Sequence, residues 1–230
     1  MKKVLGLLAL AALLLTPSLA LAQQTGIYIA PKFIYDYALI QGMQGINVYL
    51  GDTWATMNER DHIFGGALAI GYDFQSGFQV PVRAELEFAA FSQASGNSSE
   101  DFGGGLIEYD HLQLGIQTLF TNVYCDFPNS TAFTPYIGLG LGLAFIKSEG
   151  NWEQPSLGFS GTYDAKRLTN FAWNIGAGVA YNFSDSFSMD LGYRFAGLGK
   201  AETMFNSYDC RIEAKNIYMH QILFGIRVTF

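Results

Sequence analysis

KNIYMHQILFGIRVTF, residues 215–230, alternates apolar residues with small or polar ones. From Tyr218 onward, one largely apolar set contains Tyr218, His220, Ile222, Phe224, Ile226, Val228 and Phe230. The set between them contains Met219, Gln221, Leu223, Gly225, Arg227 and Thr229. A period of two predicts a strand, because a helix would mix the two sets. The apolar face would be buried in a soluble protein, whereas in a membrane barrel it would face lipid and Arg227 would face the lumen.

The same alternation recurs along the chain and predicts seven further strands, at residues 25–38, 62–74, 78–91, 108–127, 135–146, 168–183 and 187–198. Short turns at 75–77, 128–131 and 184–186 alternate with long polar or glycine-containing segments at 39–61, 92–107, 147–167 and 199–214. Bacterial outer-membrane barrels have an even strand number, short periplasmic turns and longer outer loops. The pattern therefore predicts an all-β, eight-stranded antiparallel up-and-down transmembrane β-barrel in the outer membrane, with apolar residues facing outward on every strand.

Composition agrees with a lipid-facing barrel. The 230 residues are 50% hydrophobic, 15% aromatic and only 14% charged, against roughly 25% charged residues in a typical soluble domain. Beyond the amino-terminal segment no run of apolar residues is long enough for a membrane helix. The formal charge of −7 makes nucleic acid an unsuitable partner. A soluble β-sandwich, with its apolar faces turned inward, is the alternative fold.

Residues 1–22 have the pattern of a signal peptide: Lys2 and Lys3, an apolar run, and Ala20-Leu21-Ala22 before Gln23. A membrane-anchor helix is the alternative, but the apolar run is short and ends at Pro17. Cleavage would leave residues 23–230 as the barrel domain. The two cysteines, Cys125 and Cys210, fall at opposite ends of the predicted barrel, which excludes a disulfide between them.

An eight-stranded barrel has an interior that side chains fill. The predicted inward-facing charged residues are Lys32, Asp36, Asp73, Arg83, Glu85, Glu87, Asp190, Arg194 and Arg227. Because buried charges require partners, these residues are expected to form a lumen charge network, with glycines of 135–146 and 168–183 making room for the arginines. The alternative is that the charged groups are hydrated in a narrow channel. Aromatic residues near strand ends, Tyr28 and Tyr136 among them, are expected to form the interface girdles.

The chain resembles the opacity-type, OmpA-like family of eight-stranded outer-membrane barrels. The resemblance is carried by Gly26-x-Tyr28, by Arg83-x-Glu85-x-Glu87, by PYIGLGLG at 135–142, by LGYRF at 191–195, and by Phe230. It implies a Gram-negative outer-membrane protein whose variable outer loops contact the surroundings. It also implies that Phe230 is part of the signal read by the barrel-assembly machinery.

Three functions are compatible with the sequence: a structural or surface-interaction barrel, a narrow channel for small solutes or ions, and a lipid-modifying enzyme. The outer loops, which contain Trp54, Phe102, Trp152, Phe159 and Phe205, favour a surface ligand. The three histidines, His62, His111 and His220, have no metal-ligand spacing, so no metal, cofactor or catalytic residue is predicted. The expected partners are outer-membrane lipid, lipopolysaccharide and the assembly machinery, and the protein is expected to be a monomer.

Overall fold

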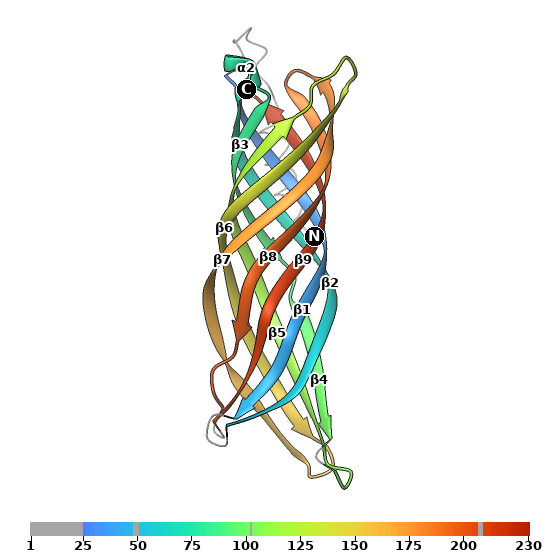
Figure 1. Ribbon diagram of the computed structural model, residues 1–230, viewed down its shortest axis with the longest axis vertical. Coiled ribbons are helices and arrows are strands. Elements are labelled where there is room, and N and C mark those ends of the chain that lie inside the picture. The colour runs from blue at the N-terminus through green and yellow to red at the C-terminus, as the bar shows by residue number, and fades with distance from the viewer. Residues whose placement is uncertain (1–24, 48–50, 102, 207–208) are drawn as a thin grey trace, which may run out of the picture.

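A computed structural model describes residues 25–47, 51–101, 103–206 and 209–230, which form one barrel of antiparallel strands (Figure 1). The elements are β1 (Ile27–Asn47), β2 (Asp52–Asp73), α2 (Phe74–Phe78), β3 (Val82–Phe91), β4 (Ala94–Asp101), β5 (Ile107–Asp126), β6 (Phe133–Gln154), β7 (Phe159–Ser184), β8 (Phe187–Glu202) and β9 (Cys210–Thr229). Strands of this length are tilted around the barrel axis, as Figure 1 shows.

The sheet closes on itself and confirms the predicted ring. Its strand order is β3-β2-β1-β9-β8-β7-β6-β5-β4, and β3 also pairs with β5. β3 and β4 pair with successive parts of β5, so in the described chain they act as one barrel strand that is interrupted at Ser92 and Gln93. Counted this way, the described residues form an eight-stranded barrel, which is closed because β3 pairs with both β2 and β5.

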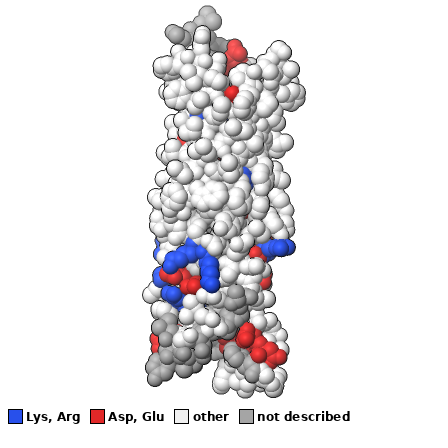
Figure 2. Space-filling model, in the orientation of Figure 1, with Lys and Arg blue, Asp and Glu red and all other residues white. Residues whose placement is uncertain are grey.

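In the half of the barrel nearest α2, the outward face is apolar, as the alternation in the last strand predicted. Phe224 is 42% exposed and Arg227 only 7% exposed, so on β9 the apolar set faces outward. The same face contains a band that we call the apolar belt: Ile29, Phe33, Phe64, Leu68, Ile70, Leu86, Phe88, Val123, Ile137, Leu139, Leu141, Leu143, Phe145, Phe171, Trp173, Ile175, Leu191, Ile222 and Phe224. Figure 2 shows a mostly uncharged surface there, with charged residues gathered toward the other end.

The four segments predicted as long outer loops are largely strand, which corrects the sequence prediction. β1 and β2 extend the barrel to Asn47 and Asp52, and β6 and β7 extend it to Gln154 and Phe159. The extension encloses a second buried cluster, the outer core, which includes Ile40, Met43, Ile63, Leu112, Leu114, Ile116, Phe120, Ile146, Tyr163, Leu198, Ile212, Ile217 and Met219. Outside the membrane the solvent is water, so here apolar side chains are stable inside the barrel.

The prediction that apolar residues face outward on every strand is therefore wrong for the outer half of β5. Leu112, Leu114 and Ile116 are at most 1% exposed and point into the outer core. His111 and Gln113, on the opposite face, are turned toward solvent. The period of two was read correctly, but the inward face changes from polar to apolar where the strand leaves the membrane.

The connection between β2 and β3 differs from the predicted tight hairpin. It contains the single-turn helix α2, and β3 begins at Val82. Asp73 accepts a hydrogen bond from the backbone nitrogen of Gln75 and so caps this helix, while Gln79 ends it with φ +57°. No helix among the described residues is long and apolar enough to cross a membrane.

Both described ends of the chain lie at the α2 end of the barrel, where the backbone nitrogen of Phe230 donates to the carbonyl oxygen of Ile27. In the sheet, Cys125 lies opposite Ile137 near this end of the barrel, and Cys210 lies opposite Asn47 at the other end. No disulfide can therefore join the two cysteines, as predicted. The predicted signal peptide, residues 1–22, lies outside the described residues.

Candidate functional site

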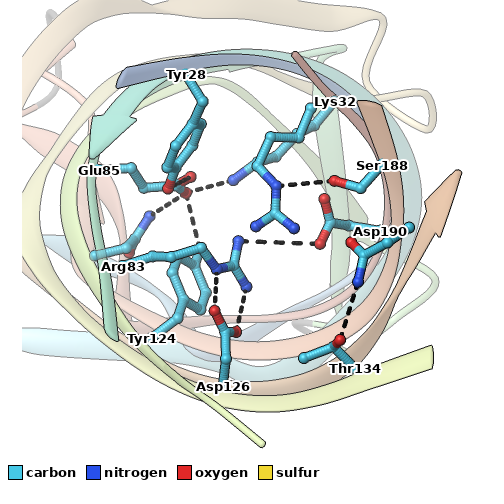
Figure 3. Close-up of polar contacts among 12 residues, drawn as sticks. Tyr28, Lys32, Arg83, Glu85, Tyr124, Asp126, Thr134, Ser188 and Asp190 are labelled. Carbon is cyan, nitrogen blue, oxygen red and sulfur yellow. Dashed lines mark hydrogen bonds and ion pairs between the residues drawn. The ribbon is translucent and has the colours of Figure 1, made fainter. Parts of the chain in front are cut away.

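The polar network that fills the lumen at the level of the apolar belt is organised around Glu85 of β3 (Figure 3). Lys32 of β1 donates to Glu85 Oε1, and so does Tyr124 of β5, over 2.8 Å. Asn122 donates to the same oxygen over 3.2 Å, and Tyr28 donates to Oε2 over 3.2 Å. Donors from two other strands thus satisfy a buried carboxylate, which would otherwise be strongly destabilising.

Glu87 forms the second centre of the network. Its fully buried carboxylate receives Lys32 Nζ at 2.6 Å and Arg194 Nη1 at 2.6 Å. Arg194 Nε donates to the amide oxygen of Gln221 over 2.5 Å, and Gln221 Nε2 donates to Asp36 over 2.7 Å. This chain of contacts joins β1, β3, β8 and β9 across the lumen.

Arg83 is held by two carboxylates and by two aromatic rings. Its Nε and Nη2 donate to both oxygens of Asp126, over 2.7 and 2.9 Å, and its Nη1 lies 4.0 Å from Asp190. The guanidinium carbon lies 5.0 Å from the ring centroid of Tyr124 and 5.1 Å from that of Tyr136. Bidentate pairing together with two cation–π contacts fixes the plane of the guanidinium.

Arg227 of β9 is bound differently, through a hydroxyl group and an aromatic ring. Its Nε donates to Ser188 Oγ over 2.9 Å, and its guanidinium carbon lies 5.6 Å from the Tyr28 ring centroid. Among the residues that the structure describes, its Nη1 has no hydrogen-bond partner. A cavity of about 40 Å³ remains beside it, which has room for only a few water molecules.

The structure brings most of the predicted lumen residues into contact with one another. Those that share ion pairs or one hydrogen-bonded chain are Lys32, Asp36, Arg83, Glu85, Glu87, Asp190 and Arg194. Arg227 faces the lumen but bonds to a hydroxyl group. Asp73 is outside the network and its placement there was wrong, because it lies at the end of β2, where its carboxylate caps α2.

Several lumen residues escaped the sequence prediction. Asp126 lies at the end of β5, where the alternation around residues 121–125 left the register open. Because the sequence reading placed Leu112 on the outward face, counting by twos from it would have turned Asp126 toward lipid. The inward position of Leu112 in the structure is what puts Asp126 on the lumen face. Tyr28 and Tyr136 were expected in the interface girdles, but both lie in the lumen, where they contact Arg227 and Arg83.

The glycines of β6 were predicted to make room for arginines. In the structure they make room mainly for tyrosine and asparagine side chains. A Cβ atom at Gly138 would lie 2.4 Å from the ring of Tyr124. At Gly140 it would lie 2.0 Å from Asn122 Oδ1 and 2.4 Å from Asn174 Nδ2. Larger residues at these two positions would displace donors on which the network depends.

The outer mouth of the barrel contains a second group of polar side chains. The hydroxyl group of Tyr163 donates to Asp110 over 2.9 Å, and the amide of Gln154 donates to Glu108 over 2.8 Å. Burial and the neighbouring Asp110 carboxylate raise the pKa of Glu108 above its usual range. Two carboxylates therefore lie side by side at this part of the mouth, and the outer core closes the barrel below them.

Beside these carboxylates lies an open pocket of about 280 Å³, whose walls include Trp152, Phe159 and Tyr163. Apolar side chains at the neighbouring strand tips are turned to solvent: Leu157 is 49%, Phe159 60%, Met204 47% and Phe205 41% exposed. Of the other loop aromatics in the sequence, Phe102 lies outside the described residues.

The histidines make surface contacts. Two share a hydrogen bond with a tyrosine at 2.7 Å, namely His62 with Tyr35 and His220 with Tyr193. His111 lies 2.7 Å from Asn97 Oδ1 and 3.6 Å from Glu153. Within the described ranges, no group of three or more His, Cys, Asp or Glu residues could hold a metal ion.

Comparison with known proteins identifies relatives over nearly the whole chain. Residues 6–230 match the family model described as outer membrane protein beta-barrel domain. Outer membrane protein PagN of Salmonella typhimurium is 36% identical over 197 residues, covering 80% of this chain and 79% of that protein. A protein of Rickettsia bellii, named as a candidate adhesin, is 24% identical over 71% of this chain and 74% of its own length. Neisserial surface protein A has the same fold, with a TM-score of 0.50 at 16% identity, over 91% of this chain and 100% of that structure.

Proposed function

This chain belongs to the outer membrane protein beta-barrel domain family, and from that premise we propose that it binds a partner outside the cell through the outer tips of its strands. The supporting observation is the exposure of Leu157, Phe159, Met204 and Phe205 around an open pocket at the mouth. Apolar side chains gathered on a water-facing surface mark an interaction site. The adhesin name of the Rickettsia bellii relative agrees with this role.

The barrel below the tips acts in this proposal as a rigid support. The outer core packs the extension from within, so the tips stand beyond the membrane on paired strands. Rigid elements present a binding surface at a lower entropic cost than mobile loops.

Transport is less well supported than surface binding. The lumen at belt level is occupied by paired charged side chains, and the outer core lies between this network and the mouth. A solute would have to displace both layers. Catalysis has no supporting geometry among the described side chains, since His62 and His220 pair with tyrosines.

The test is adhesion of a non-adherent Gram-negative strain that expresses the protein, counted on cultured epithelial cells. Wild type should increase the number of bound bacteria, and Leu157→Ser with Phe159→Ser should remove most of that increase. Phe78→Ser is the matched control, because Phe78 is 65% exposed at the opposite end of the barrel. Equal binding by the tip variant and wild type, with both folded in the outer membrane, would contradict the proposed function.

A further inference from the structure

Two cations stand side by side on the outer surface where the apolar belt ends. The outward residues of β6 run Leu139, Leu141, Leu143 and Phe145, and the next outward residue is Lys147. On β7 the outward apolar run ends at Phe171, and Arg167 follows two outward positions later. Lys147 and Arg167 are direct partners in the sheet, so their side chains share one face.

This pair is only partly neutralised. Lys147 Nζ lies 2.6 Å from Glu149, but the side chains are 42% and 35% exposed, and an exposed ion pair contributes little stability. Arg167 is exposed and has no ion pair within the described part of the chain. One net positive charge therefore remains at the border between the belt and water.

A groove of about 410 Å³ runs beside the pair on the outer face of β5, β6 and β7. Gly115, the partner of Lys147 on β5, opens it, because a Cβ there would meet no atom closer than 3.8 Å. Phe145 forms an apolar wall on the belt side, and Gln117 and Thr169 add polar groups. The groove thus joins a surface that faces acyl chains to two cationic groups.

We propose that this groove binds a phosphate-bearing glycolipid of the outer leaflet, with Lys147 and Arg167 on the phosphate and Phe145 against an acyl chain. The position favours a lipid, because only a molecule that lies in the membrane can contact the apolar belt and the cations together. Arginine forms bidentate hydrogen bonds with phosphate, and Lys147 adds a point charge once it exchanges Glu149 for the lipid. This site is independent of the mouth surface, so it holds whether or not the protein is an adhesin.

The test is native mass spectrometry of the detergent-purified barrel, titrated with bis-phosphorylated lipid A and with the same lipid after enzymatic dephosphorylation. The double variant Lys147→Gln, Arg167→Gln should bind the phosphorylated lipid about tenfold or more weakly than wild type. Arg60→Gln is the matched control: Arg60 is an exposed cation on β2 and does not line the groove. The single variant Arg167→Lys, in which Lys147 is unchanged, should keep most of the affinity for the phosphorylated lipid.

Heat-modifiable gel migration checks that each variant is folded. Dephosphorylated lipid should bind wild type about tenfold more weakly than the phosphorylated form, and millimolar inorganic phosphate should not displace the bound lipid. The proposal is overturned if the double variant binds like Arg60→Gln, if removing the phosphates leaves the affinity unchanged, or if free phosphate competes fully.

Discussion

Replacing Glu87 with glutamine removes the charge that two lumen cations share. Glu87 is fully buried and lies 2.6 Å from both Lys32 Nζ and Arg194 Nη1. Breaking a buried ion pair on one side typically costs about 3–5 kcal/mol, because the remaining charge stays buried without a partner. Lys32 keeps Glu85, so the loss falls mainly on Arg194, and we expect Glu87→Gln to lower the free energy of unfolding by about 3 kcal/mol.

Urea unfolding of the barrel in lipid vesicles, followed by tryptophan fluorescence, measures this change. Glu153→Gln is the control, since Glu153 is an exposed carboxylate 3.6 Å from His111, and its effect should stay within about 0.5 kcal/mol. Adding Arg194→Met to Glu87→Gln should recover part of the loss, because the guanidinium that lost its carboxylate is then gone. If the free energy of unfolding of Glu87→Gln lies within about 0.5 kcal/mol of the wild-type value, the lumen charges are hydrated and the paired network is the wrong description.

Three further outcomes are expected. Leu114→Ala, in the outer core, should lower the free energy of unfolding by about 2–5 kcal/mol, whereas Leu141→Ala in the lipid-facing belt should cost much less; equal effects would exclude a packed outer core. Because the pKa of Glu108 is raised, the folded state binds this proton more tightly than the unfolded state, and the ionised carboxylate is destabilising above the folded pKa. Glu108→Gln should therefore raise the melting temperature near neutral pH, with the difference closing as the pH falls to about 4, and a difference independent of pH would contradict this sign. In planar bilayers the protein should give no stable conductance steps, and reproducible openings would favour the channel.

The alternation of side chains was enough to predict the ring of strands and the lipid-facing surface. Ile222 and Phe224 point outward and Gln221 and Arg227 inward, as the period of two in the last strand requires. Most of the lumen charges follow from the same pattern, because a charged residue between two lipid-facing ones has only the interior available.

The outer half of the barrel could not be read in this way, because the solvent outside changes from lipid to water along one strand. β5 keeps its period, but its inward side chains are Leu112 and Leu114 near the mouth and Asn122 near the periplasmic end. Glycines such as Gly42 and Gly51, both with positive φ, made residues 39–61 resemble a loop although most of them are paired. Individual partners such as Asp126 for Arg83 depend on strand stagger, which alternation alone does not define.

Oxygen accessibility of spin labels along β9 tests most directly that apolar side chains face lipid and charged ones the lumen. Cys125 and Cys210 would be replaced by serine, and single cysteines placed at residues 221, 222, 223, 224 and 226 in a barrel reconstituted in lipid vesicles. Collisions with dissolved oxygen, which concentrates in acyl chains, should peak at Ile222, Phe224 and Ile226 and fall at Gln221 and Leu223. Peaks at 221 and 223, or equal values at all positions, would contradict a membrane-spanning barrel with a filled lumen.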